Sequence, residues 1–268
     1  MSEDKLEKLS FPEKTAKALL QFAQKQFEEG GQHRVHFIKG EDDVNKLLDP
    51  HGQYPHAFVL ACIMDRQIPA EKAWRIPKLV KKAINSFEMK DLLGVSEEKY
   101  KRIFREMPKD QKHRHPEKMA SFFYKAVQKI HDVYNDDASE IWKGNLPSGI
   151  LVSRFLQFEG VGVKIATMAT NILVRQFGIR VEDKHCIDIS PDTHTVHVFQ
   201  RLHLIQSNSI EETIYIARKI NPEYPGILDY PCFNVGRNYC NARSPKCNGK
   251  EGKGTCPFFV FCPSKNQN

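Results

Sequence analysis

Apolar residues recur at helical spacing along most of the chain, starting near its N-terminus. Ser10 and Glu13 have the spacing of a capping box, and Pro12 is tolerated in a first helical turn. The apolar positions after them are Ala16, Leu19, Leu20, Ala23 and Phe27, and Gly30 and Gly31 end the pattern. The pattern predicts an amphipathic helix from about residue 10 to residue 30.

Six consecutive helices are predicted between residues 55 and 178. Prolines open four of them, Ser96 caps another, and a glycine turn precedes the last. Their expected ranges are 55–66, 77–86, 96–106, 116–134, 147–157 and 163–178. The first is apolar on nearly every side, which indicates a buried helix. Shorter helices are expected on either side. No useful length of sequence alternates with a period of two, so we expect an all-α protein.

Long polar connections separate some of these helices. Residues 109–118 form a basic linker, and residues 178–192 form an irregular segment with Pro191 directly before Asp192. Loop histidines lie in both: His113 and His115 in the first, and His185 beside Cys186 in the second. Such exposed histidines could touch phosphate, and Cys186 with His185 could hold a second metal. The sequence does not say what these two loops do.

Composition sets limits on the class of protein. The chain has 268 residues, 40% of them hydrophobic, which is enough for a folded core. Its net charge of +7 favours an anionic partner, although a solvated basic surface is the simpler alternative. The first ten residues lack the apolar stretch of a secretion signal, and no run of about 18 apolar residues could span a membrane. We therefore expect a cytoplasmic or nuclear protein.

The segment FEGVGVKIATMATNIL, residues 158–173, contains two glycines directly before a helix. Gly160 and Gly162 permit positive φ angles and leave backbone N–H groups uncovered around Val161. The following helix start adds unpaired N–H groups and the positive end of its dipole. Together these can hold a DNA phosphate without reading a base. An ordinary turn between two helices is the alternative.

Lys164 lies in the first turn of that same helix. A lysine is unfavourable beside the positive end of the dipole, and such a place favours the neutral, nucleophilic amine. The alternative is a solvated lysine, or one that only contacts phosphate.

Four of the seven cysteines lie within 23 residues near the C-terminus, spaced C-x6-C-x8-C-x5-C. They are Cys240, Cys247, Cys256 and Cys262. Without a secretion signal this pattern indicates metal or cluster ligation, and four thiolates fit zinc or a [4Fe–4S] cluster. The paired C-x2-C spacing that zinc ribbons favour is absent from the sequence. Disulfides and zinc remain alternatives, and Cys62 and Cys232 are expected to be packed thiols.

Three segments together resemble the endonuclease III branch of the helix-hairpin-helix (HhH-GPD) DNA glycosylases. They are FEGVGVKIATMATNIL, then SPDTHTVHVFQRL at 190–202, then GRNYCNARSPKC at 236–247 with the two cysteines beyond it. The likeness covers roughly residues 55 to 262, with the motifs in the family's order. It implies an iron–sulfur cluster loop and two helical domains, a six-helix barrel at 55–180 and a discontinuous cluster domain at 1–54 and 181–268. Duplex DNA would bind a monomer in the cleft between them.

The resemblance also implies residue roles. Lys164 stands at the place of the catalytic lysine and Asp192 at that of the catalytic aspartate before Thr-His. Asp192 would stabilise positive charge on the sugar, and Lys164 would form a Schiff base with C1′ of a flipped-out nucleotide. Asp192 could instead, or in addition, cap the helix that follows. Gln67 matches the residue that fills the gap left by the flipped base, with Asp65 and Arg66 lining the same cleft; a helix-terminal polar residue is the alternative.

The departures from the family pattern concern substrate choice more than fold. Glu159 replaces the usual proline before the hairpin and adds negative charge near a phosphate site. Pro191 replaces an aliphatic residue, and eight residues separate Cys247 from Cys256 where the family usually has two. The expected activity is removal of a damaged base, an oxidised pyrimidine, with AP lyase cleavage. The alternatives are a monofunctional glycosylase for a mispaired adenine or an alkylated base, and a non-enzymatic protein that binds DNA structure.

Overall fold

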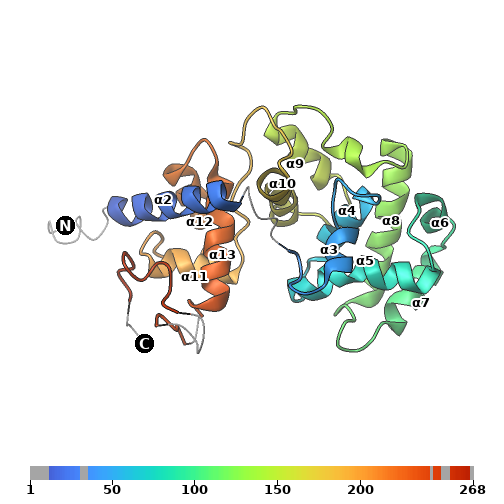
Figure 1. Cartoon of the computed structure of the whole chain (residues 1–268), viewed down its shortest axis with the longest axis horizontal. Helices are drawn as coiled ribbons and strands as arrows, with labels where there is room; N and C mark the ends of the chain where they lie inside the picture. Colours follow the sequence, from blue (N-terminus) through green and yellow to red (C-terminus); the bar gives the residue numbers. More distant parts are fainter. Residues whose placement is uncertain (1–11, 31–35, 242–243, 249–253, 266–268) are drawn as a thin grey trace. The chain divides into compact units, whose positions relative to one another are not determined.

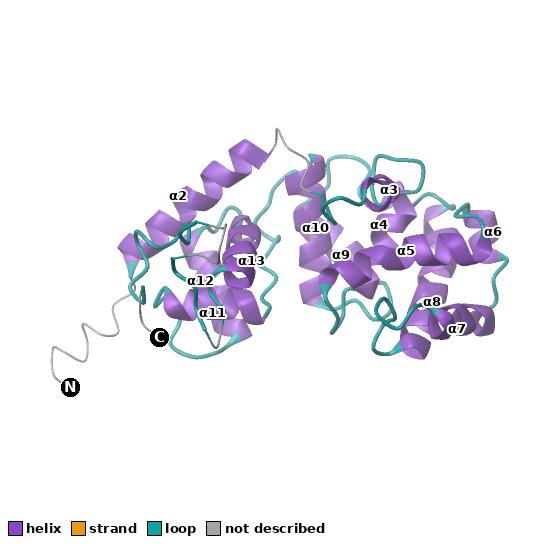
Figure 2. Ribbon diagram, turned by 60° about the horizontal axis from the view of Figure 1, so that its bottom comes forward, coloured by secondary structure: helices purple, strands orange, loops and turns teal. Residues whose placement is uncertain are grey.

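The computed structural model describes residues 12–30, 36–241, 244–248 and 254–265. The chain divides into two compact units, residues 33–182 and residues 1–32 with 183–268. The described residues form helices and no strand, apart from one isolated parallel bridge between Leu146 and Val181. Figure 2 shows helices throughout both units. The all-α prediction is therefore confirmed.

The described residues of the larger unit form six longer helices and three short ones. In chain order they are α3 (Asp42–Leu47), α4 (Pro55–Met64), α5 (Ala70–Ile84), α6 (Met89–Leu93), α7 (Glu97–Glu106), α8 (Pro116–Tyr134), η1 (Ala138–Ile141), α9 (Ser148–Leu156) and α10 (Val163–Phe177). Helix α4 lies at the centre, in contact with α5, α8, η1 and α10 (Figure 1). Every residue of α4 after Pro55 is buried, which explains why its sequence is apolar on nearly every side.

Most of the predicted helix starts in this unit agree with the structure, and one is wrong. The Ser96 hydroxyl accepts a hydrogen bond from the Lys99 N–H and caps α7, as its sequence predicts. Helix α5, however, begins at Ala70, and Pro77 lies inside it. A proline in a helix interior removes one hydrogen bond, and burial of Trp74 and Ile76 beside it offsets that loss.

Residues 36–54 belong to the larger unit, although the resemblance of the sequence implies that residues 1–54 are part of the cluster domain. Val44, Leu47 and Leu48 of this segment are buried in the same hydrophobic core as α4. Helix α3 also packs against α5. Helix α3 agrees with the expectation of shorter helices outside residues 55–178, whereas α6 and η1 are not predicted, because each spans only about one helical turn.

The smaller unit is built from both ends of the chain. It contains α2 (Glu13–Gly30), α11 (Thr193–Arg201), α12 (Ile210–Ile220), η2 (Pro225–Leu228) and α13 (Asp229–Asn238). Helix α2 packs against α12, η2 and α13, and the ring of its Phe22 meets the edge of Phe258, 5.1 Å away between centroids. The predicted cap Ser10 lies outside the described residues.

Helices α11 and α13 approach each other closely at Gly236. A Cβ atom there would lie 2.7 Å from the carbonyl oxygen of His194. Only glycine allows this packing.

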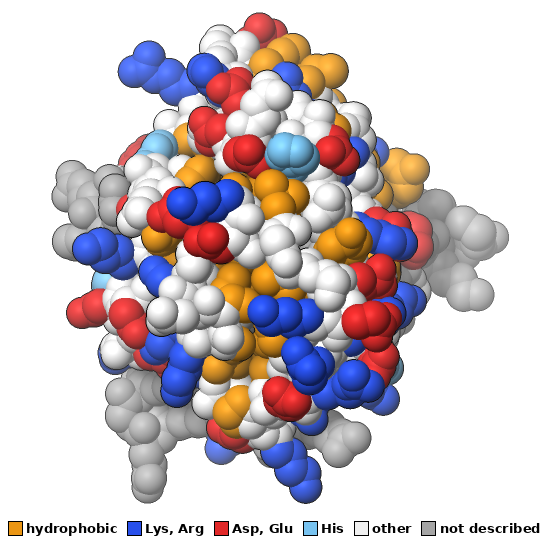
Figure 3. Space-filling model, turned by 90° about the vertical axis from the view of Figure 1, so that its right-hand side faces the viewer, with side chains coloured by type: hydrophobic (Ala, Val, Ile, Leu, Met, Phe, Trp, Pro, Cys, Tyr) orange, Lys and Arg blue, Asp and Glu red, His pale blue; other side chains and the backbone are white. Residues whose placement is uncertain are grey.

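No helix among the described residues is long and apolar enough to cross a bilayer. On the face shown in Figure 3, acidic and basic side chains are interspersed around apolar patches. The net charge of +7 therefore does not by itself mark this face as a binding surface for DNA.

Candidate DNA-binding and catalytic site

The predicted glycine hairpin connects α9 to α10, and Gly160 is its tightest point. Gly160 has a φ of +84°, which L side chains rarely adopt. A Cβ atom there would lie 2.6 Å from the ring of Phe122 in α8. The Val161 N–H donates to the Phe158 carbonyl at 3.0 Å, and its half-buried side chain packs on the core. Both the turn and the packing therefore require glycine at position 160.

Gly162 differs from Gly160 in its backbone conformation and in the space around it. It is the N-cap of α10 in an extended conformation, and a Cβ atom there would meet nothing within 4 Å. Its carbonyl accepts from the N–H groups of Ile165 and Ala166. Within the described part of the chain, the N–H groups of Gly162, Val163 and Lys164 have no acceptor. This exposed row of donors at a helix start is suited to an anion such as phosphate.

Lys164 is the second residue of α10 and forms an ion pair with Asp65. Its Nζ atom lies 3.4 Å from Oδ2 of Asp65. The lysine side chain is 44% exposed, whereas that of Asp65 is only 10% exposed. A lysine is unfavourable at the positive end of a helix dipole, and the negative charge of the Asp65 carboxylate compensates for this interaction.

The two residues after Asp65 reach two further segments. Arg66 donates from Nη1 to the Gly160 carbonyl at 2.6 Å, and its guanidinium lies 5.7 Å from the centroid of the Phe122 ring. Gln67 has a φ of +54°, and its Oε1 lies 3.2 Å from Nε2 of His115. The structure thus brings all three predicted residues of the α4–α5 connection against the hairpin or the 109–118 loop.

The basic loop before α8 is anchored by a buried histidine. His113 is 2% exposed, and its Nδ1 accepts from the His115 N–H at 3.0 Å. Burial lowers the pKa of His113, so the neutral ring that can accept this bond is favoured. The expectation that His113 is an exposed loop histidine is therefore wrong. His113 lies two positions before His115 in a polar linker, and this sequence pattern does not indicate burial.

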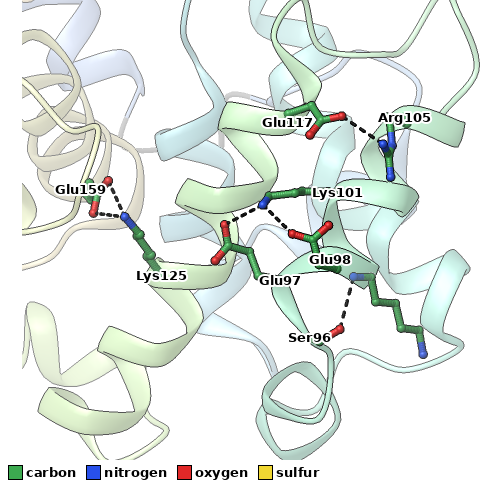
Figure 4. A network of polar contacts seen from close by, with 9 residues as sticks. Ser96, Glu97, Glu98, Lys101, Arg105, Glu117, Lys125 and Glu159 are labelled. Carbon is green, nitrogen blue, oxygen red and sulfur yellow. Dashed lines mark hydrogen bonds and ion pairs between the residues drawn. The ribbon is translucent and has the colours of Figure 1, made fainter.

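Glu159 does not leave an uncompensated negative charge beside the hairpin. Both of its carboxylate oxygens bind Nζ of Lys125 in α8, at 2.8 and 2.7 Å. Figure 4 shows Lys125 pointing to Glu159, at one end of a series of ion pairs that includes Arg105 with Glu117. The sequence could not show this pairing, because the two residues are 34 positions apart.

Asp192 belongs to the smaller unit and caps α11. Its Oδ1 accepts from the Thr195 N–H at 2.8 Å, so the predicted capping role is confirmed. The segment before it is fixed by a bond from the Ser190 N–H to Asp229. Among the described residues no hydrogen-bond donor meets Oδ2 of Asp192. One oxygen therefore holds the helix, and the other is available to a bound molecule.

The four predicted ligand cysteines line one cavity in the smaller unit. Cys240, Cys247, Cys256 and Cys262 surround it together with apolar residues that include Phe258. Burial raises the pKa of Cys240 to about 12 and that of Cys256 to about 11. The described residues contain no set of three or more His, Cys, Asp or Glu side chains placed around a single metal ion.

The remaining cysteines do not line this cavity. Cys62 and Cys232 are fully buried, as predicted, and burial raises the pKa of both thiols. Cys186 is partly exposed in the loop before α11.

Two solved structures are similar to the chain over nearly its whole length. One is endonuclease III in a trapped covalent intermediate with DNA, an estranged-adenine complex, with a TM-score of 0.58 and 18% identity over 92% of this chain and 95% of that chain. The other is a thermostable thymine-DNA glycosylase, with a TM-score of 0.59 and 14% identity over 95% and 98%. No protein-family model and no curated protein matches the chain by sequence. The chain has the fold of the helix-hairpin-helix DNA glycosylases.

Proposed function

We propose that the protein is a DNA glycosylase of base excision repair with AP lyase activity. The observation that carries this proposal is the amine of Lys164, which lies in the first turn of α10 beside the unpaired backbone N–H groups of Gly162, Val163 and Lys164 itself. That arrangement can bind a phosphate and offer a nucleophile to the adjacent sugar. The shared fold supports it, since one of the similar structures is a covalent endonuclease III–DNA intermediate.

The chemistry follows from the two predicted catalytic residues. The hairpin binds the phosphate backbone, and the damaged nucleotide leaves the stack because its C1′ is unreachable in a duplex. The C1′–N bond breaks with both electrons leaving on the base, and the Asp192 carboxylate stabilises the sugar cation that develops. The Lys164 amine then forms a bond to C1′ and loses a proton. The C1′–O4′ bond of the sugar ring breaks with its electron pair going to O4′, which takes up a proton, and the resulting iminium acidifies the 2′ proton for β-elimination.

The proposed substrate is an oxidised pyrimidine in duplex DNA, acted on by a monomer. This choice rests on the sequence motifs, which resemble the endonuclease III branch. Gln67, exposed and with a positive φ, is the side chain proposed to enter the gap left by the flipped base.

The cysteine cavity is proposed to hold a [4Fe–4S] cluster. The donor type fits such a cluster, because four cysteines line one cavity with apolar walls. Such a cluster would supply structural cross-links between the end of α13 and the last described residues. The cysteine thiols would lose their protons on binding, and no catalytic step requires the cluster.

A panel of duplexes, each with a single lesion, tests the proposal in the presence of borohydride. Release of an oxidised pyrimidine together with a trapped protein–DNA adduct is the expected result. Release of a base without an adduct would show a monofunctional glycosylase. Binding with neither reaction on any lesion would show a DNA-structure-binding protein.

A further inference from the structure

The backbone at Asp65 is fixed in place independently of the ion pair between its side chain and Lys164. The Asp65 N–H donates to the Cys62 carbonyl at 3.1 Å, and the Arg66 N–H donates to the Met64 carbonyl at 2.8 Å. The bond from Arg66 to the Gly160 carbonyl ties the same segment to the hairpin. Asp65 therefore stands at a set position beside the start of α10.

Lys164 is the adjustable member of the pair. Its side chain is 44% exposed, and an unrestrained lysine side chain samples many rotamers, which opposes holding the amine in one place. The helix terminus repels its charge and would drive it toward solvent. The buried carboxylate opposes both effects, so it restricts the amine to the neighbourhood of the hairpin.

From these contacts we propose that Asp65 is a positioning residue, which holds the Lys164 amine beside the phosphate-binding hairpin for attack on the sugar. The inference rests on the proposed lyase function. At an abasic site the ammonium first releases one proton to solvent. The amine lone pair then adds to the C1′ aldehyde to give a carbinolamine. Its hydroxyl takes up one proton from solvent and leaves as water, which gives the iminium that borohydride reduces. Asp65 takes no part in the bond changes; it sets where the amine starts.

The test is single-turnover trapping on a duplex that contains one abasic site, over a range of protein concentrations. Asp65→Asn keeps the size of the side chain and removes its charge, and Asp65→Ser provides a second variant. Both should trap about 10- to 100-fold more slowly at saturating concentration, with the half-saturating concentration unchanged within about twofold. A role limited to folding or DNA binding would instead move the half-saturating concentration.

Glu41→Gln is the matched control. Glu41 forms an ion pair with Arg75 at 2.6 Å in the same unit, and both side chains are partly buried. Loss of this carboxylate should leave the trapping rate within about twofold of the unmodified protein.

The outcomes distinguish the positioning role of Asp65 from the proposed lyase function. If the unmodified protein yields no adduct, the proposed lyase function fails. If it yields the adduct and both Asp65 variants trap within about twofold of its rate, the positioning role is overturned while the lyase function stands. A loss confined to the half-saturating concentration would overturn it equally.

Discussion

The Gly160–Gly162 hairpin is held by side chains from other segments of its unit, whereas the cysteine cavity is lined by a terminal segment whose described residues after Asn238 contain no helix. At the hairpin, Arg66 bonds the Gly160 carbonyl, Lys125 balances Glu159, and Phe122 packs under the turn. These contacts fix the shape of the hairpin without a ligand, so the proposed binding of DNA there would need little free energy for ordering it.

The cysteine cavity is lined by this segment together with residues of α11 and α13, among them Val198 and Val235. Phe258 is buried against Phe22 of α2, and short backbone bonds join Cys256 to Cys247 and Cys262 to Phe258. If the proposed cluster binds there, it would add cross-links that this segment otherwise lacks. The hairpin is thus preorganised by protein contacts, whereas the cysteine segment is proposed to be stabilised by its ligand.

Removal of one cysteine should give the largest effect. The unmodified protein should purify brown, with about four iron and four sulfide per chain. Cys240→Ala should lose the colour, and limited proteolysis should then cut the segment after Asn238 while the larger unit stays intact. Stoichiometric zinc without visible absorption would contradict the cluster proposal.

Asp192→Asn tests the contribution of the smaller unit to chemistry. The amide can still accept the bond from the Thr195 N–H, so α11 should remain capped. The sugar cation loses its counter-charge, and base release should slow on the order of a hundredfold or more. Single-turnover base release and lesion binding measure this. A rate within about threefold of the unmodified protein would remove Asp192 from the mechanism.

The two glycines of the hairpin test the preorganisation of the larger unit. Gly160→Ala combines a positive φ with a clash against Phe122, and should destabilise the turn by about 1–3 kcal/mol. Damaged and undamaged duplex should both bind more weakly, because phosphate contacts carry no base information.

Gly162→Ala is the matched comparison, since its Cβ atom meets open space. Its cost should stay below about 1 kcal/mol. Duplex affinities across a series of salt concentrations measure both variants, and the unmodified protein should lose affinity steeply with salt. Equal losses for the two variants would show that backbone conformation at Gly160 is not what holds the hairpin.

The smallest expected effect concerns His56 in the core around α4. Burial lowers its pKa from 6.5 to about 4, while its Nε2 bonds the Phe87 carbonyl at 2.8 Å. The unfolded chain binds the proton more readily, so this contribution is complete above pH 6.5 and is lost as the pH falls through about 4.

His56→Gln removes this titration. Its free energy of unfolding should depend less on pH across this window, by on the order of 1–3 kcal/mol. Denaturant unfolding of both proteins at several pH values measures the difference. Parallel pH profiles would show that His56 does not contribute.

Local signals were enough to predict much of the fold. Ser96 caps α7 and Asp192 caps α11, because a cap acts on N–H groups only a few residues away. The helix start predicted at Pro77 is wrong, because burial of the residues around it stabilises a helix that continues through the proline. The spacing of the four cysteines predicts metal or cluster ligation, which stays a prediction; the structure places all four at one cavity.

The contacts that organise the candidate site could not be predicted. Lys164 pairs with a residue 99 positions away, and Arg66 bonds a carbonyl 94 positions away. No pattern along the sequence encodes such pairs, because they follow from how α4 and α10 pack. The sequence predicts that Lys164 is a reactive lysine, and the structure shows that the carboxylate of Asp65 forms an ion pair with it.

The most direct test of the central claim is borohydride trapping with Lys164→Gln. The variant should still bind lesion DNA, because one side chain is lost from an interface with many contacts. It should form no trapped adduct and should not cleave the strand at an abasic site. An adduct yield equal to that of the unmodified protein would show that another amine, such as Lys118 or the N-terminus, is the nucleophile.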